Sequence, residues 1–97
     1  MNIETFENIV KEQIDKCKYT LITKNKEYAT EDVFHAFKKA AALEGITKEQ
    51  ALAGMMAKHT VSIYDMIGQE YSLDRWDEKI GDNINYLLIL AAMLREG

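Results

Sequence analysis

The stretch from Trp76 to Leu94 constrains the fold most, because it is long enough for one helix and its second half is almost entirely apolar. Read at helical spacing, its apolar residues recur at steps of four and three and form one stripe that needs a covering partner. The stripe consists of Trp76, Ile80, Ile84, Leu87, Ala91 and Leu94. From Tyr86 onward the helix is apolar on nearly every side, which is typical of a helix with several neighbours. We expect it to lie at the centre of a bundle, or to be shared with a second subunit.

Upstream of this stretch, the pattern predicts further helices. The chain contains no proline, and since a proline inside a helix costs about 3 kcal/mol, its absence favours uninterrupted helices. Apolar residues at steps of three and four predict a first helix over residues 3–21, followed by a polar connection in which Asn25 ends the helix. A second helix is predicted over residues 33–44, with Gly45 as its C-terminal cap.

Capping signals mark the remaining two helices. Thr47 and Gln50 fit a capping box at the start of the third helix, and Gly68 fits its end. Ser72 or Asp74 fits the N-cap of the last helix. We therefore predict a single all-α domain covering residues 1–97, built as a four-helix bundle and assembled as a dimer or a higher oligomer.

Composition narrows the function classes. A domain of 97 residues buries only about 60–65% of its unfolded surface, so oligomerisation would help its stability. The net charge is −4 with no basic tract, which argues against binding to duplex nucleic acid. The single cysteine, Cys17, excludes an internal disulfide and suits a reducing compartment. We find no secretion signal and no membrane-spanning stretch, so we expect a cytoplasmic protein with no membrane partner.

Glu78, Asp82 and Asn85 form a polar row on the last helix, because they follow one another at steps of four and three. Two carboxylates on one helix face can bind Mg²⁺, which keeps several waters and completes its shell with substrate phosphates. We therefore consider Glu78 and Asp82 candidate metal ligands and Asn85 a candidate ligand-binding residue. The alternative is an ordinary solvated helix face, since acids four residues apart are common there.

The third helix carries a second polar row. Lys58, Ser62 and Asp65 are spaced at four and three, beside His59, which occupies an otherwise apolar row. Together they could bind phosphate and orient a water molecule, which makes all four candidate ligand-binding residues and makes His59 and Asp65 candidate catalytic groups. The alternative is a buried polar network that holds the helices in register without a function.

Two further candidates come from the segment before the second helix. Lys26 and Tyr28 lie in a polar connection where a cation and an aromatic ring could meet a phosphate and a planar base. His35 is a weaker candidate for binding the same ligand, because a lone histidine is more often a surface or packed side chain. We find no glycine-rich phosphate loop, no HExxH motif and no nucleophile elbow.

Three segments, KNKEYA (24–29), AGMMAKHTVSIYDM (53–66) and DEKIGDNINYLLIL (77–90), resemble the small phage-encoded and prophage-encoded helical proteins grouped with the nucleotide modification associated domains. A more distant similarity is to the MazG-like all-α nucleotide pyrophosphohydrolases, which work as dimers or tetramers and bind Mg²⁺ through acids on two helices. That similarity implies that the later acidic motif falls on Glu78 and Asp82, although here they are four residues apart and not three. The earlier acidic cluster would fall near Lys58, where this chain has no glutamate.

From these residues and this resemblance we expect a protein that binds a nucleotide or a nucleotide-like signal in a polar groove between the third and fourth helices, during phage infection or the defence against it. If the chain is phage-encoded, the host cytosol is the expected compartment. The first alternative is a Mg²⁺-dependent nucleotide pyrophosphohydrolase. The second is an interaction protein that inhibits a host defence factor through its acidic surface.

Overall fold

The computed structural model of the chain describes residues 1–27 and 32–96, with the side chains of residues 25–27 left out. Within these ranges it contains four α-helices and no strand, which confirms the all-α prediction. The helices are α1 (Ile3–Glu27), α2 (His35–Glu44), α3 (Lys48–Met66) and α4 (Leu73–Met93).

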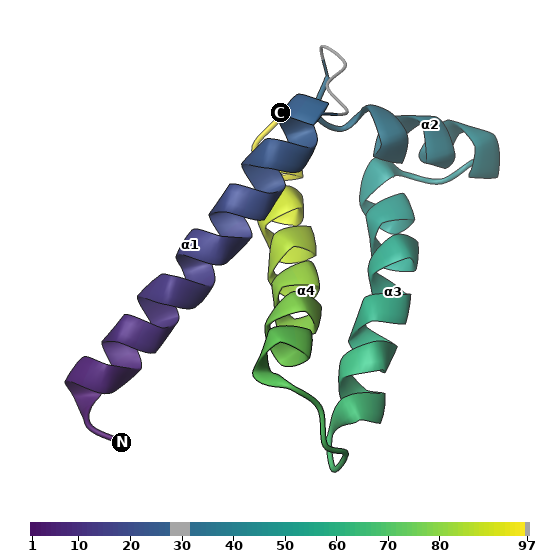
Figure 1. Cartoon of the computed structure of the whole chain (residues 1–97). Helices are drawn as coiled ribbons and strands as arrows, with labels where there is room; N and C mark the ends of the chain where they lie inside the picture. The colour runs from purple at the N-terminus through teal and green to yellow at the C-terminus, as the bar shows by residue number, and fades with distance from the viewer. Residues whose placement is uncertain (28–31, 97) are drawn as a thin grey trace.

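The helix α4 lies between α1 and α3, as expected of the most apolar helix in the chain. It runs in the same direction as α1 and opposite to α3, while the short α2 packs mainly against α3 and also touches α4 through the rings of Phe37 and Tyr86 (Figure 1). The N-terminal half of α1 diverges from α4 and projects from the rest of the molecule. The bundle is therefore tight on the α3 side of α4 and open on the α1 side.

The helix boundaries follow the capping signals. The Thr47 hydroxyl accepts a hydrogen bond from the Gln50 amide (3.1 Å) and the Thr47 amide donates to Gln50 Oε1 (3.0 Å), so the predicted capping box is present. Gly45 caps α2 with φ = 70°, a left-handed conformation that glycine adopts without strain. Of the two candidate caps for α4, Ser72 fills the position and accepts from the Arg75 amide (3.2 Å).

The first helix is longer than predicted: it does not end at Asn25 but continues to Glu27. The physical reason is that residues 22–27 contain neither glycine nor proline, and Lys and Glu are good helix formers even where no apolar stripe continues. The helix thus includes residues 22–27, which were predicted to form a polar connection, and this places Lys24 one turn beyond Thr20 on the same side of α1.

The hydrophobic core joins α2, α3 and α4, and its buried residues are Phe34, Leu52 and Met93. Phe37, Tyr86, Ile89 and Leu90 pack around them. Leu87 and Leu94 of the predicted stripe are exposed in the single chain, so the other helices of the same chain do not cover this part of it. Beyond Tyr86 the helix is apolar all round, so several faces could have been buried, and α2 and α3 cover the one that carries Tyr86 and Met93.

Candidate functional site

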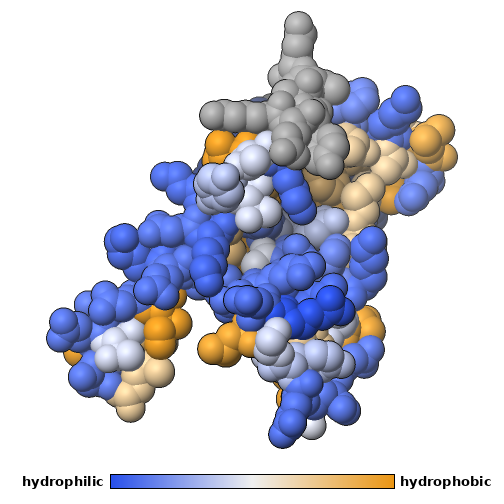
Figure 2. Space-filling model, viewed as in Figure 1, coloured by the Kyte–Doolittle hydropathy of each residue, from blue (hydrophilic) through white to orange (hydrophobic). Residues whose placement is uncertain are grey.

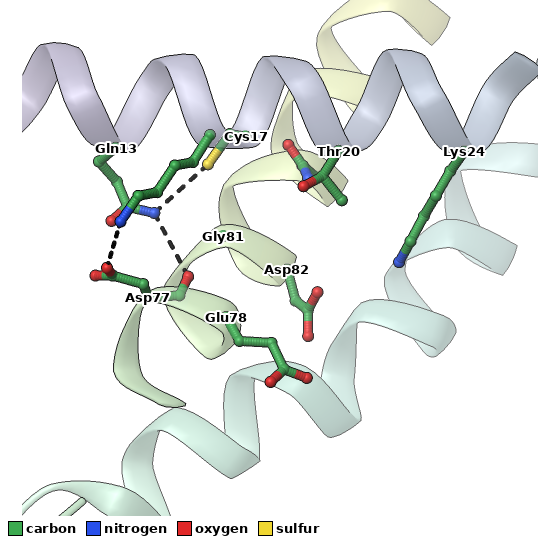
Figure 3. A pocket seen from close by; sticks show the side chains of 10 residues that line it. Gln13, Cys17, Thr20, Lys24, Asp77, Glu78, Gly81 and Asp82 are labelled. Carbon is green, nitrogen blue, oxygen red and sulfur yellow. Dashed lines mark hydrogen bonds and ion pairs between the residues drawn. The ribbon is translucent and has the colours of Figure 1, made fainter. Parts of the chain in front are cut away.

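A pocket of about 310 Å³ lies between α1 and α4 (Figure 3). Most of the residues that line it are polar or charged, with cations, carboxylates and amides from the two helices, although apolar atoms form the larger part of its surface. The lining residues are Gln13, Lys16, Cys17, Thr20 and Lys24 of α1, and Asp77, Glu78, Gly81, Asp82 and Asn85 of α4.

On the α1 side, the polar residues of the pocket follow one another at steps of three and four. Lys16 Nζ lies 2.9 Å from Asp77 Oδ2, and this hydrogen bond and charge raise the pKa of Lys16. Gln13 Nε2 is close to the Asp77 carbonyl (3.5 Å), so these contacts join the middle of α1 to the start of α4. Lys24 approaches from the opposite end of the pocket (Figure 3). Among the described residues it has no ion-pair partner.

On the α4 side, one row of side chains faces the pocket. Glu78, Asp82 and Asn85 all line it, so the row predicted from their spacing does face a hollow. Asn85 Oδ1 is buried and has no hydrogen-bond partner among the described residues, which is costly for a polar atom unless a ligand or a water satisfies it. Gly81 forms part of the wall, and a Cβ there would lie 3.6 Å from Cys17 Sγ.

Asp82 is shared between the pocket and the seam that joins α3 to α4. Its Oδ2 lies 3.6 Å from His59 Nδ1, an ion pair when the imidazole is protonated. The His59 ring lies 5.1 Å from the ring of Tyr86. Burial raises the pKa of Tyr86, and the charge of Asp82 raises it further, so the phenol stays protonated at neutral pH.

The same seam contains a hydrogen-bonded clamp centred on Asn83. Its Nδ2 donates to the carbonyl oxygens of His59 (3.1 Å) and Lys79 (2.9 Å), and its Oδ1 accepts from the Thr60 hydroxyl (3.2 Å). This clamp joins α3 to α4 through residues other than Lys58, Ser62 and Asp65, the polar row predicted on the third helix.

The predicted site residues separate into three groups. Glu78, Asp82 and Asn85 line the pocket, and His59 reaches its edge through Asp82. The other described candidates lie outside the pocket lining: Lys58 and Asp65 are exposed on α3, Ser62 is half-buried there, and His35 is exposed at the start of α2. The side chain of Lys26 and the whole of Tyr28 lie outside the described residues.

The sequence predicted a groove between the third and fourth helices, whereas this pocket lies between α1 and α4, so its α1 half was missed. Gln13, Lys16, Thr20 and Lys24 contribute polar atoms to it, and none of the four was a candidate site residue. One signal was present: these residues recur at helical steps beside Cys17, on the flank of the apolar stripe. The pattern could not show which helix lies next to these residues, because nothing in α1 alone indicates that this side of the helix faces the acids of α4.

Within residues 1–27 and 32–96, no three His, Cys, Asp or Glu side chains gather closely enough to hold a metal ion. In the same ranges, no helix combines the length and the apolar character needed to cross a bilayer. No family model, curated protein or solved structure matches this chain.

Proposed function

We propose that the protein binds a nucleotide in the pocket between α1 and α4, and that it does so as a homo-oligomer. The observation that carries the proposal is the distribution of charge in this pocket. A lysine without an ion-pair partner among the described residues, Lys24, lies at one end, and the acceptors of Glu78, Asp82 and Asn85 line the other helix.

This distribution is complementary to a molecule that is anionic at one end and carries hydrogen-bond donors at the other. A nucleotide has both: its phosphate would meet the ammonium group of Lys24, and the amino or imino groups of its base would donate to Asn85 Oδ1 and to the carboxylates. The volume of about 310 Å³ is at the small end of the range for ligand pockets, which suits a mononucleotide and not a dinucleotide.

Isothermal titration calorimetry with a panel of ribonucleotides and deoxyribonucleotides tests the proposal. We expect saturable heat with at least one member, and an affinity lowered by about 10-fold or more in Lys24→Ala, because a charged hydrogen bond contributes about 1.5–3 kcal/mol. Lys18→Ala is the matched control, since Lys18 is an exposed lysine of the same helix outside the pocket. The proposal is wrong if no nucleotide gives heat, or if both lysine variants lose the same affinity.

The second candidate function is Mg²⁺-dependent hydrolysis of the bound nucleotide. It is favoured by the placement of Glu78 and Asp82 in one pocket, because two carboxylates together with substrate phosphates can hold Mg²⁺. His59, next to Asp82, would be the group that orients water. Release of phosphate or pyrophosphate that requires Mg²⁺ or Mn²⁺ and is lost in Asp82→Asn would support turnover. Binding without product release would leave the protein as a binder only.

A further inference from the structure

The single chain exposes more surface than a protein of its mass does when it folds alone. Its accessible surface is 7360 Å², whereas a monomeric globular protein of this mass exposes about 5,700 Å², so the excess is about 1,700 Å². The radius of gyration, 15.3 Å, also exceeds the value of about 13 Å that is typical of a compact domain of 100 residues. A surface of this size requires an explanation.

Part of the excess lies on α1. Its apolar stripe of Ile3, Phe6, Val10 and Ile14 is 44–69% exposed, and it occupies the half of the helix that projects away from α4 (Figure 1). Figure 2 shows hydrophobic atoms along this projecting half, at the lower left. Only the continuation of the stripe at Cys17 is buried. An amphipathic helix with an uncovered stripe is typical of a helix that lacks its packing partner.

A second exposed stripe lies on α4. Ile80, Leu87 and Leu94 follow one another at steps of seven and are 37–68% exposed. These are residues of the stripe that the sequence predicts to be covered, and neither α1 nor α3 covers them. The surrounding helices therefore leave one apolar face of α4 open.

The two stripes lie on the same side of the α1–α4 pair. In α4, with about 100° of rotation per residue, Ile80 and Leu87 lie about 140–160° around the helix from Asp82, which faces the pocket. In α1, Val10 and Ile14 lie about 120–160° from Lys16 and about 20–60° from Cys17, which lies beside Gly81 of α4 at the wall of the pocket. Because α1 and α4 run in the same direction, the rotation from Lys16 past Cys17 to Val10 and the rotation from Asp82 past Gly81 to Ile80 lead to the same side of the helix pair, opposite the pocket. We call these seven residues the α1–α4 apolar face: Ile3, Phe6, Val10, Ile14, Ile80, Leu87 and Leu94.

We propose that a second copy of this chain covers the α1–α4 apolar face, so that α1 and α4 of two protomers form a shared four-helix core. The area supports this occupant. The excess of two protomers together is about 3,400 Å², which leaves enough surface for an interface in the range of about 2,000–5,000 Å² that is typical of obligate homodimers. A two-fold interface is self-complementary, so one contact covers the apolar face of both copies.

This inference rests on the proposed homo-oligomer and identifies the α1–α4 apolar face as the surface through which it forms. It does not depend on the ligand, because the face and the pocket lie on opposite sides of the α1–α4 pair. It gives each protomer its own pocket on the outside of the dimer. Loss of nucleotide binding therefore leaves it intact, and loss of the dimer leaves the charges of the pocket unchanged.

Light scattering coupled to size-exclusion chromatography tests the proposal with two matched pairs of variants. Val10→Asp and Leu87→Asp place a charge on the apolar face of α1 and of α4, and we expect both to halve the mass from two chains to one. Val61→Asp on α3 and Leu43→Asp on α2 are the controls, because these side chains are also exposed (56% and 80%) but lie outside the face. Both controls should keep the mass of two chains.

Circular dichroism of every variant shows whether it folds. If an aspartate variant unfolds, Val10→Ala and Leu87→Ala replace it, and each should raise the dissociation constant of the dimer by about 10-fold or more, since each removes buried apolar contacts from both protomers. A wild-type protein that has the mass of one chain at micromolar concentration overturns the proposal. So does an unchanged mass in the folded variants of α1 and α4, or dissociation of the controls to the same extent.

Discussion

The two long sides of α4 differ in what they contact. Toward α2 and α3 the helix contributes to an apolar core in which Leu52 and Met93 are each only 2% exposed. Toward α1 it carries Glu78, Asp82 and Asn85 beside a pocket that also contains lysines. Well-packed interiors leave few voids larger than a water molecule, so a polar hollow in such a small domain stands apart from its core. The difference suggests that one seam of α4 provides stability and the other is available for a ligand.

The largest expected difference between the two seams concerns the free energy of unfolding. Leu52→Ala removes a buried side chain from the α2–α3–α4 core and should lower this free energy by about 2–5 kcal/mol. Cys17→Ala removes one buried atom from the α1–α4 seam and should lower it by about 1 kcal/mol. Urea titrations followed by circular dichroism measure both. Equal losses would contradict the division between a stabilising seam and a binding seam.

Two asparagines on α4 provide a sharper test, because they lie two residues apart and face different seams. Asn83 makes two hydrogen bonds that hold α3 to α4, one with the Thr60 hydroxyl and one with the His59 carbonyl, so Asn83→Ala should lower the free energy of unfolding by about 1–3 kcal/mol. Asn85 lines the pocket, and its buried Oδ1 has no hydrogen-bond partner in the part of the chain that the structure describes, so Asn85→Ala should leave stability nearly unchanged and weaken nucleotide binding.

Thermal unfolding and calorimetry with the best nucleotide from the panel give the two measurements for each asparagine variant. The expected pattern is a crossed one: Asn83→Ala loses stability, and Asn85→Ala loses affinity. A stability loss in Asn85→Ala as large as that in Asn83→Ala would show that both residues are structural.

Local signals in the sequence predicted the parts of the fold that depend on a few neighbouring residues. The Thr47–Gln50 capping box and the left-handed cap at Gly45 are confirmed, because each is decided within one turn of helix. The end of α1 was mispredicted, since the loss of an apolar stripe was taken for the loss of the helix. The last turns to Glu27 contain no glycine or proline and include lysine and glutamate, which are good helix formers.

Only the α4 half of the pocket could be predicted from the sequence, because the contacts between its two halves join residues that are far apart in the chain. Glu78, Asp82 and Asn85 share one helix face, which spacing alone reveals. Their neighbours Gln13, Lys16, Thr20 and Lys24 are more than 50 positions away in the chain, and their placement depends on how α1 packs against α4. Likewise, the apolar character of α4 after Tyr86 could not indicate which of its faces α2 and α3 cover.

A pair of glycines tests the pocket with a smaller effect. Gly81→Ala and Gly54→Ala both introduce a better helix former in a helix interior, and each should raise the free energy of unfolding by about 0.5–1 kcal/mol. The new Cβ at residue 81 would meet Cys17 Sγ at 3.6 Å, an ordinary contact, whereas the one at residue 54 has nothing within 4 Å. Only Gly81 lines the pocket, so only Gly81→Ala should weaken nucleotide binding. Equal affinities in the two variants would place the ligand elsewhere.

The smallest expected effect concerns acid unfolding and the ion pair between Lys38 and Asp32, which lies outside the pocket lining. The hydrogen bond from Lys38 Nζ to Asp32 (2.7 Å), together with the one from the Phe34 amide (2.9 Å), lowers the pKa of Asp32 below its usual 3.8. The unfolded state then binds a proton more readily than the folded state. The contribution of this ion pair to the free energy of unfolding is therefore fully present above the pKa of Asp32 in the unfolded state. It is lost as the pH falls through the lower pKa of Asp32 in the folded state.

Urea titrations between pH 6 and pH 2 compare the wild type with Asp32→Asn to test this dependence. Above the pKa of Asp32 in the unfolded state, the wild type should have the higher free energy of unfolding. Its advantage over Asp32→Asn should shrink as the pH falls below this value, because the wild-type carboxylate becomes protonated. Since Asp32 and Lys38 are partly exposed, the difference should be small and should decrease with added salt. A difference that is constant across this range would mean that Asp32 acts through its hydrogen bond to the Phe34 amide, which an asparagine can also accept, and not through its charge.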